Sequence, residues 1–307
     1  MIVDLPDTDT GAVSKKLISL RESGGAVTIG RVLTLIVSAE EGEPTESAIE
    51  AANDASREHP CRVIVIARGA RDERTRLDAQ IRVGGDAGAS EVVVLRLYGP
   101  LADHGDSVVL PFLLPDTPVV AWWPGQAPTV PADDRLGKLA TRRITDAARC
   151  AVTLGGDARA ALSARESGYR PGDSDLTWSR ITPWRALLTA SIDEPPHSPI
   201  TGARVSGPAG APEIELLAGW LQAQLDVPVQ RVVGSFEVRL HQSDGTLTLA
   251  VDQNNTAVIS RPGQPDGRVA IAHRDISDCL AEELRRLEDD VIYQLALTGV
   301  PQVEEAS

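Results

Sequence analysis

The chain has 307 residues and a mass of 32.6 kDa, which suits one large or two ordinary domains with a sizeable buried core. Its composition, 42% hydrophobic and 24% charged, is that of a globular protein and excludes a disordered one. Acidic residues outnumber basic residues by 44 to 30, giving a formal net charge of −14. That charge argues against general nucleic-acid binding and against docking on anionic lipid.

The cellular compartment is predicted from what the sequence lacks. No basic segment followed by an apolar stretch opens the chain, so no secretory signal is visible. The most apolar run, residues 107–123, is broken by three prolines and cannot form a spanning helix. Cys61, Cys150 and Cys279 lie too far apart for a disulfide framework or a zinc site. We therefore expect a cytoplasmic protein with reduced thiols.

The first half of the sequence has an α/β pattern. Apolar runs at residues 32–37 and 63–67 flank an Ala-rich helical segment, which is typical of a sheet covered on both faces. We expect helices at residues 9–22, 45–58 and 103–113, strands at 77–83, 91–97, 119–123 and 143–146, and a turn at 84–88. This predicts an α/β domain over residues 1–168, with a largely parallel or mixed sheet and flanking helices.

The second half has an α+β pattern. A polar segment with Pro and Gly, residues 168–175, predicts a linker. Apolar residues spaced by three or four predict a long terminal helix from about residue 275 to Gly299. Further helices are expected at 176–192, where Pro183 should kink or restart the helix, and at 213–225. Strands are expected at 203–206, 233–241, 246–251, 256–260 and 268–272, with a hairpin turn at 243–245. This predicts an α+β domain over residues 169–307 with an antiparallel meander.

Motifs for catalysis are missing from the sequence. The pair Gly137-Lys138 is followed by Leu139, so no phosphate-binding P-loop is present. No glycine-rich dinucleotide motif follows the first apolar run, and neither a GxSxG nor an HExxH motif occurs. The five histidines are scattered, with no two at ligand spacing on one helix. We therefore assign no catalytic, cofactor-binding or metal-binding residues and expect no cofactor.

The cysteine in the segment His59-Pro60-Cys61-Arg62 has two interpretations. Arg62 could lower the pKa of the Cys61 thiol and make it reactive. The favoured alternative is that Cys61 opens a buried strand and behaves as a small hydrophobic residue.

Adjacent tryptophans mark the first candidate for an interaction surface. On an extended segment Trp122 and Trp123 point to opposite faces, so only one can easily enter a given core. The other must be covered by a helix, a second domain or a partner, and these alternatives stay open. Asp116, in the same proline-rich segment, belongs to this candidate surface.

The second candidate surface is the predicted helix that follows the linker. Asp175 and Trp178 are three residues apart and Arg180 and Trp184 four apart, so each pair should share a helix face. Arg and Trp side chains suit cation–π packing and anion contacts alike. Phosphate or partner binding is one interpretation, and a core helix with solvated arginines is the favoured alternative. The candidate partner-binding residues are Asp116, Trp122, Trp123, Asp175, Trp178, Arg180, Trp184 and Arg185.

These same stretches carry a resemblance to a known family. The segments MIVDLPDT, EAANDASREHPCRVIVI, LPFLLPDTPVVAWWP, RRITDA and DLTWSRITPWRALL together resemble the glucose-6-phosphate dehydrogenase assembly protein family (OpcA), in order from Met1 to about Gly299. The resemblance implies a protein that is not an enzyme and that binds glucose-6-phosphate dehydrogenase in the oxidative pentose phosphate pathway.

The resemblance also implies that the protein promotes the active oligomer of the dehydrogenase and raises its activity or its affinity for substrate. The Arg and Ala bias suits an actinobacterial-type member. Cyanobacterial members are redox-responsive through cysteines, but the three distant cysteines here offer no obvious dithiol. We therefore expect an allosteric activator and assembly factor. The alternatives are an α/β protein that binds a phosphorylated sugar or nucleotide, as sensor or enzyme, and a scaffold without kinetic effect.

Overall fold

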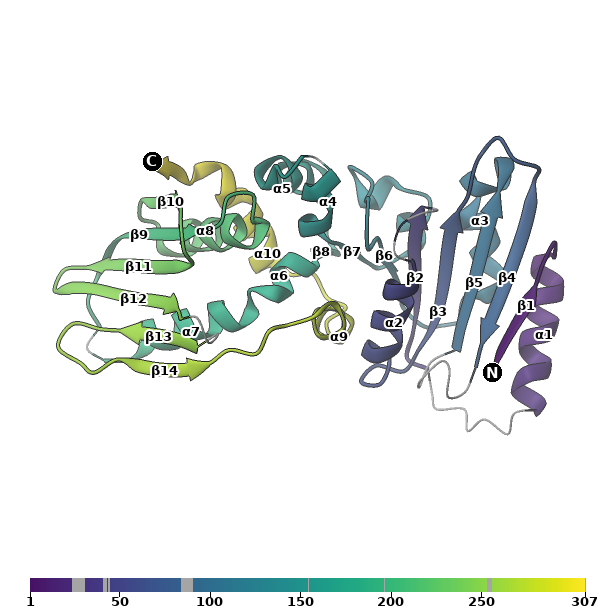
Figure 1. Ribbon diagram of the computed structural model, residues 1–307, viewed down its shortest axis with the longest axis horizontal. Helices are drawn as coiled ribbons and strands as arrows, with labels where there is room; N and C mark the ends of the chain where they lie inside the picture. Colours follow the sequence, from purple (N-terminus) through teal and green to yellow (C-terminus); the bar gives the residue numbers. More distant parts are fainter. Residues whose placement is uncertain are drawn as a thin grey trace. The chain divides into compact units, whose positions relative to one another are not determined.

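The computed structural model describes residues 1–23, 31–40, 43, 45–83, 91–153, 155–195, 197–252 and 256–306. The chain forms two compact units that interleave along the sequence (Figure 1). Unit 1 comprises Met1–Asp146, Arg170–Leu176 and Ile276–Asp289, and unit 2 comprises Ala147–Tyr169, Thr177–Asp275 and Asp290–Ser307. The predicted fold class, an α/β unit and an α+β unit, is confirmed. The domain boundary at residues 168–169 stays a prediction.

Unit 1 is built on an eight-stranded mixed sheet. Its strand order is β1-β4-β5-β3-β2-β6-β7-β8; β1 pairs antiparallel with β4 and β4 with β5, and the remaining neighbours are parallel. The strands are β1 (Ile2–Leu5), β2 (Leu33–Glu40), β3 (Cys61–Arg68), β4 (Arg76–Arg82), β5 (Glu91–Tyr98), β6 (Val119–Trp122), β7 (Arg142–Thr145) and β8 (Asp173–Asp175). The helices are α1 (Thr10–Ser23), α2 (Thr45–Ala55), α3 (Gly105–Val109) and α9 (Ile276–Arg285).

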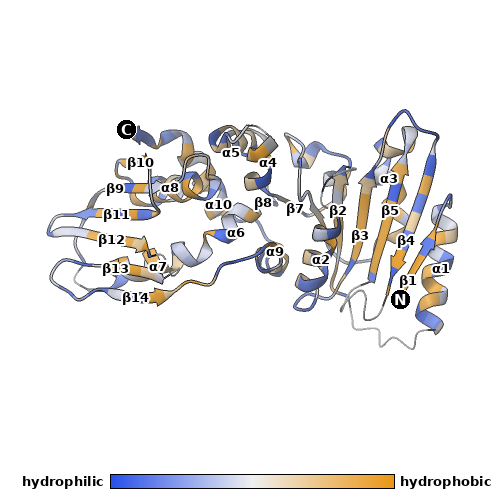
Figure 2. Cartoon of the chain, in the orientation of Figure 1, coloured by the Kyte–Doolittle hydropathy of each residue, from blue (hydrophilic) through white to orange (hydrophobic). Residues whose placement is uncertain are grey.

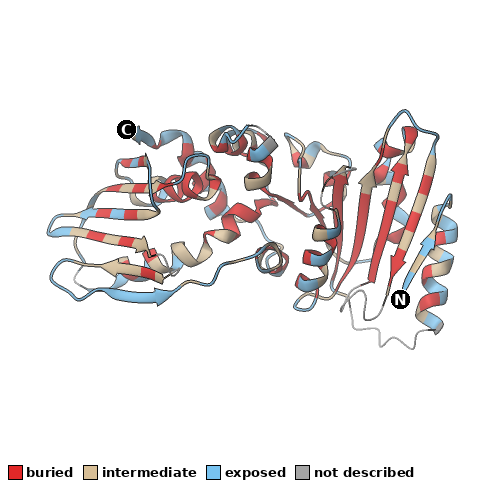
Figure 3. Ribbon diagram, in the orientation of Figure 1, coloured by how far each residue is buried: buried red, intermediate tan, exposed pale blue. Residues whose placement is uncertain are grey.

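The central strands of this sheet are buried on both faces, as their continuous apolar sequences predict. Leu35 belongs to a cluster with residues of α2 and α9, whereas its neighbour Ile36 belongs to a cluster with residues of α1. Figures 2 and 3 show β2, β3 and β5 as largely hydrophobic and buried. Alternation of successive side chains between two apolar layers therefore accounts for the continuous apolar runs in the middle of these strands.

Two predictions for unit 1 are corrected by the structure. The helix expected over residues 103–113 is only α3 followed by a 3₁₀ turn at Leu110–Phe112, because Pro111 removes a helical N–H and clashes with the preceding turn. The segment expected as a linker contains β8, which pairs in parallel with β7 at the sheet edge. Its polar residues are buried because the carboxylate of Asp173 pairs with Arg143, their oxygen and nitrogen lying 2.5 Å apart. The turn predicted at residues 84–88 lies outside the described residues.

Unit 2 is built on a seven-stranded sheet with the order β14-β13-β12-β11-β9-β10-β15. The predicted antiparallel meander is confirmed as β11–β14, whereas β9, β10 and β15 are parallel. The strands are β9 (Ile200–Gly207), β10 (Val229–Val233), β11 (Glu237–Gln242), β12 (Gly245–Val251), β13 (Thr256–Ser260), β14 (Gly267–Ala270) and β15 (Glu304–Ala306). The helices are α4 (Ala147–Thr153), α5 (Ala158–Gly168), α6 (Leu176–Arg180), α7 (Thr182–Asp193), α8 (Pro212–Leu225) and α10 (Val291–Gly299).

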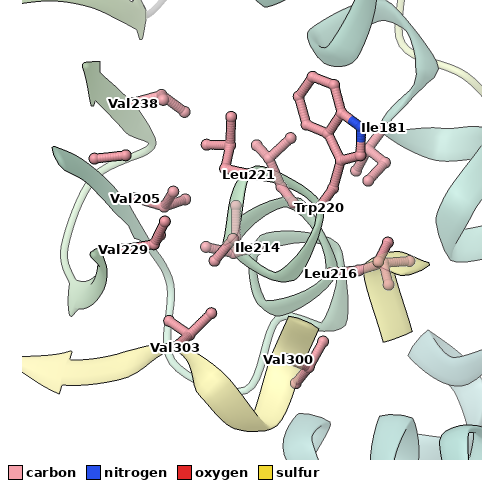
Figure 4. Close-up of a cluster of buried hydrophobic side chains, with 14 of the residues drawn as sticks. Ile181, Val205, Ile214, Leu216, Trp220, Leu221, Val229, Val238, Val300 and Val303 are labelled. Carbon is pink, nitrogen blue, oxygen red and sulfur yellow. The ribbon is translucent and has the colours of Figure 1, made fainter. Parts of the chain in front are cut away.

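Helix α8 lies at the centre of the unit 2 core. Figure 4 shows Ile214 and Leu221 on α8 beside Val205 and Val238 of the sheet. Helix α10 approaches α8 closely at Gly219, where an added Cβ would lie 2.5 Å from the Ala296 carbonyl oxygen. The missing side chain lets the two helices pack backbone to backbone.

The terminal helix is present as α10, but the helical pattern from residue 275 is divided between two helices. Helix α9 packs against α2 in unit 1, and α10 packs against α8 in unit 2. Asp290 ends the intervening segment as the N-cap of α10, since its Oδ1 accepts a hydrogen bond from the Tyr293 amide at 2.9 Å. The apolar periodicity on both sides of this cap is continuous, so periodicity alone did not reveal the break.

Candidate functional site

The adjacent tryptophans at the end of β6 are both buried within unit 1. Trp122 packs in the cluster with α2 and α9, and Trp123 packs in the cluster with α1, each with 1% of its surface exposed. The Trp123 amide donates a hydrogen bond to the Ile144 carbonyl at 3.0 Å. The chain itself therefore covers both rings, which corresponds to the intramolecular alternative. A role for them in partner binding stays a prediction.

The two predicted aspartates occupy very different places. Asp116 is exposed and has a positive φ of 55°, in the turn before β6. Asp175 is the last residue of β8, and it is buried with Oδ2 accepting a hydrogen bond from Thr145 Oγ1 at 2.5 Å. The expectation that Asp175 shares a helix face with Trp178 is wrong, because Asp175 ends a strand and α6 begins only at Leu176.

The predicted long helix restarts at Pro183, as expected, and forms α6 and α7. Trp178 is buried, and its Nε1 donates a hydrogen bond to Asp290 Oδ2 at 2.8 Å. The guanidinium carbon of Arg185 lies 3.5 Å from the centroid of a Trp178 ring, in cation–π geometry. Arg185 also donates a hydrogen bond to Thr182 Oγ1 at 2.8 Å. Trp178 and Arg185 thus hold α6 and α7 to each other and to the start of α10.

Arg180 and Trp184 meet at a surface cavity of about 340 Å³. The half-buried Trp184 ring packs against Phe236, with their centroids 4.4 Å apart. Arg180 Nη1 lies 3.8 Å from Glu213 Oε1, and Arg274 Nη1 donates a hydrogen bond to the Ser179 carbonyl at 2.6 Å. The cavity is lined by Arg180, Ile181, Pro183, Trp184, Glu213, Ile214, Leu217, Phe236, Val251, Ile271, Ala272, His273 and Arg274.

Sequence reasoning missed most of this cavity. Phe236 and the segment 271–274 come from parts of the chain that no motif singles out, and only the fold brings them to α7. Phe236 is one of two phenylalanines in the whole chain, and it lies between β10 and β11, where the sequence analysis expects one continuous strand over residues 233–241. Of the eight predicted residues, Arg180 and Trp184 line the cavity and Arg185 supports their helix.

A cluster of three arginines and one carboxylate lies at the beginning of β5 in unit 1. Arg21, Arg31 and Arg62 surround Glu91, with nitrogen–oxygen distances of 2.6, 3.1 and 2.8 Å. Although burial alone would raise it, the hydrogen bond from Arg21 and the charges of the other two arginines hold the pKa of Glu91 below its usual value. The cluster lets a buried carboxylate stay ionised at the beginning of β5.

The three cysteines are buried. Burial raises the pKa of the Cys61 thiol to about 12, with the charge of Arg31 offsetting part of the effect, which confirms the favoured interpretation of a small buried residue. Within the described parts of the chain, no group of three or more His, Cys, Asp or Glu side chains could hold a metal ion. Among those same residues, no helix is long and apolar enough to cross a membrane.

An α/β unit, an α+β unit and an aromatic-lined surface cavity define a protein of two units with a candidate binding site in the second one. Residues 52–166 match the family described as "Glucose-6-phosphate dehydrogenase subunit N-terminal domain", and residues 171–297 match its C-terminal counterpart. The chain belongs to the OpcA glucose-6-phosphate dehydrogenase assembly family, which confirms the resemblance found in the sequence. The family name implies association with glucose-6-phosphate dehydrogenase.

Comparison with curated proteins and solved structures adds little. No curated protein matches the sequence. Two solved structures align weakly, one described as trehalose-6-phosphate from E. coli bound with UDP-2-fluoro glucose and one as an apo structure of OtsA. Their identities are 10% and 9%, they cover 65% and 66% of this chain, and their TM-scores are 0.23 and 0.24. This chain spans 64% and 65% of theirs, less than two thirds, and likeness at this level carries no functional argument.

Proposed function

We propose that this chain is a non-catalytic allosteric activator and assembly factor of glucose-6-phosphate dehydrogenase. It binds the dehydrogenase in the cytoplasm and favours the active oligomer, and thereby promotes NADPH production in the pentose phosphate pathway. Family membership supports the choice of partner. The observation that supports a binding role for unit 2 is the half-buried Trp184, which lies with Phe236 in an open cavity beside arginines.

The mechanism that we propose is a population shift. A protein that binds the active oligomer more tightly than the inactive form moves the equilibrium toward the active one. Moving the dehydrogenase from about 10% to about 90% active requires a difference in affinity of about 80-fold, which is within the range typical of allosteric coupling. No group on this chain has to take part in the reaction itself.

The contact residues that we propose are the accessible members of the predicted set. Arg180, Trp184 and Arg185 are partly exposed on α6 and α7, and Asp116 is exposed in unit 1. The remaining four residues are buried, and we propose that they act only by maintaining the fold that presents the contact residues: Trp122, Trp123, Asp175 and Trp178.

The proposal is tested by the oligomer distribution of the cognate dehydrogenase, measured by mass photometry with and without this chain. We expect addition of this chain to enrich a defined oligomer. Trp184→Ala should weaken binding by about 30-fold, the loss typical of an aromatic hot spot. Thr189→Ala, at an exposed position on the same helix that does not line the cavity, is the matched control and should bind normally. An unchanged oligomer distribution at saturating wild-type chain would contradict the proposal.

A further inference from the structure

The cavity beside Trp184 has an apolar interior made by side chains from five parts of unit 2. Trp184 and Pro183 come from α7, Ile214 and Leu217 from α8, Val251 from β12, and Phe236 and Ile271 from segments beside the meander. Ile214 and Leu217 are buried, so the unit 2 core forms the floor of the cavity. An apolar group that enters gains the contacts of this interior and releases the water that covers it.

The charged groups at the cavity have a net positive character in a chain whose overall charge is −14. Two arginines, Arg180 and Arg274, line it together with the single carboxylate of Glu213. Arg180 Nη1 lies 3.8 Å from Glu213 Oε1, and 19% of the Arg180 side chain is exposed. A carboxylate next to an entering apolar group would therefore meet favourable charge at the rim.

The volume limits the size of the occupant. A cavity of about 340 Å³ lies at the lower end of the range of about 300–1,000 Å³ for ligand pockets. It suits one large side chain and part of a neighbouring residue better than a dinucleotide. The exposed Ala272 and His273 at its edge leave the opening accessible to a protein segment.

We propose that this cavity receives an aromatic or branched apolar side chain of the dehydrogenase that has an Asp or Glu beside it in sequence. The side chain enters against Trp184 and Phe236, and the neighbouring carboxylate pairs with Arg180 or Arg274. This inference rests on the proposed function, since the occupant belongs to the partner named there. It specifies the anchoring residue type, which the family name does not.

The native cysteines make a direct test of occupancy straightforward. Cys61, Cys150 and Cys279 are all buried, so a thiol introduced at an exposed position should be the one that reacts with a maleimide. Ala272→Cys places it at the edge of the cavity. Ala223→Cys is the matched control, because residue 223 is exposed on α8 but lies about 15 Å along the helix from Glu213.

We expect the dehydrogenase to slow labelling of Ala272→Cys at least tenfold and to leave Ala223→Cys unaffected. A benzophenone maleimide attached at position 272 should cross-link to a dehydrogenase peptide in which an aromatic or branched apolar residue adjoins Asp or Glu. A second variant, Ala272→Trp, fills the opening from an exposed position, and it should lower affinity at least tenfold without lowering the melting temperature.

Several results would overturn this inference while leaving the proposed function intact. In the first, the dehydrogenase does not slow maleimide labelling of Ala272→Cys although the wild-type chain still activates it. In the second, the dehydrogenase protects Ala272→Cys and Ala223→Cys equally. In the third, Ala272→Trp binds the dehydrogenase with unchanged affinity. Protection by glucose 6-phosphate or NADPH alone would assign the cavity to a small molecule instead. Failure of the proposed function would give a different result, because the wild-type chain would then neither bind nor activate the dehydrogenase.

Discussion

Replacing Glu283 with alanine removes one partner of a buried ion pair that ties α9 to the sheet of unit 1. Glu283 Oε2 lies 2.5 Å from Arg142 Nη2 and 2.5 Å from Ser174 Oγ. Only 2% of the Arg142 side chain and 4% of the Glu283 side chain are exposed. Breaking such a pair from one side costs about 3–5 kcal/mol, because an uncompensated charge stays buried. Arg142 keeps a 2.7 Å hydrogen bond to the Glu288 carbonyl. We therefore expect Glu283→Ala to lower the free energy of unfolding by about 3 kcal/mol, the lower end of that range.

Two further variants separate the charge from the packing. Glu283→Gln retains an oxygen acceptor and should cost less, about 1–2 kcal/mol. The double variant Arg142→Met with Glu283→Leu replaces the pair by apolar side chains and should lie within about 1 kcal/mol of wild type. The free energy of unfolding is best followed by hydrogen exchange of β7 and α9 in rising urea, which reports unit 1 alone. A loss below 1 kcal/mol for Glu283→Ala, or a double variant as unstable as the single one, would refute the reasoning.

Three further predictions concern unit 1. At pH 8 the native Cys61 thiol, with its pKa raised to about 12, should resist thiol reagents and react only after unfolding; native labelling at the denatured rate would contradict its burial. The lowered pKa of Glu91 means that its ion pairs stabilise the fold above the usual Glu value near 4.5 and lose that effect as the pH falls through the lowered pKa. The melting-temperature advantage of wild type over Glu91→Gln should therefore shrink in acid, and a pH-independent difference would oppose this. Trp123→Ala should cost about 3–5 kcal/mol in urea unfolding, and a loss below 1 kcal/mol would contradict its packing.

Much of the fold follows from apolar patterning in the sequence. The runs that form β2, β3 and β5 are predicted to be strands buried on both faces, since most of their successive side chains are apolar. The hairpin between β11 and β12 follows from Asp244-Gly245 in the same way. Alternation and turn residues are local properties, so they can be seen in one stretch of sequence.

What the sequence could not reveal depends on partners distant along the chain. The segment of β8 has the sequence pattern of a polar loop, because Asp173 and Asp175 pair with Arg143 and Thr145, which lie some thirty residues earlier. Helix α9 belongs to unit 1 through its packing against α2 and through the pair of Glu283 with Arg142, which no local pattern indicates.

The candidate site was predictable only in part for the same reason. Arg180 and Trp184 are four residues apart and both line the cavity, but they do so from α6 and α7 and not from one helix face as expected. Phe236 and Arg274 join them from the meander and the segment after it, through tertiary packing alone.

The central claim is that this chain activates the dehydrogenase without catalysing a reaction itself. The most direct measurement is glucose-6-phosphate-dependent NADP reduction by the cognate dehydrogenase, followed at 340 nm as this chain is titrated in, with each protein alone as a control. We predict a saturable rise in kcat or fall in apparent KM, no turnover by this chain alone, and a curve shifted to higher concentration for Trp184→Ala but not for Thr189→Ala. A rate that stays unchanged across a clear excess of well-folded wild-type chain would contradict the claim.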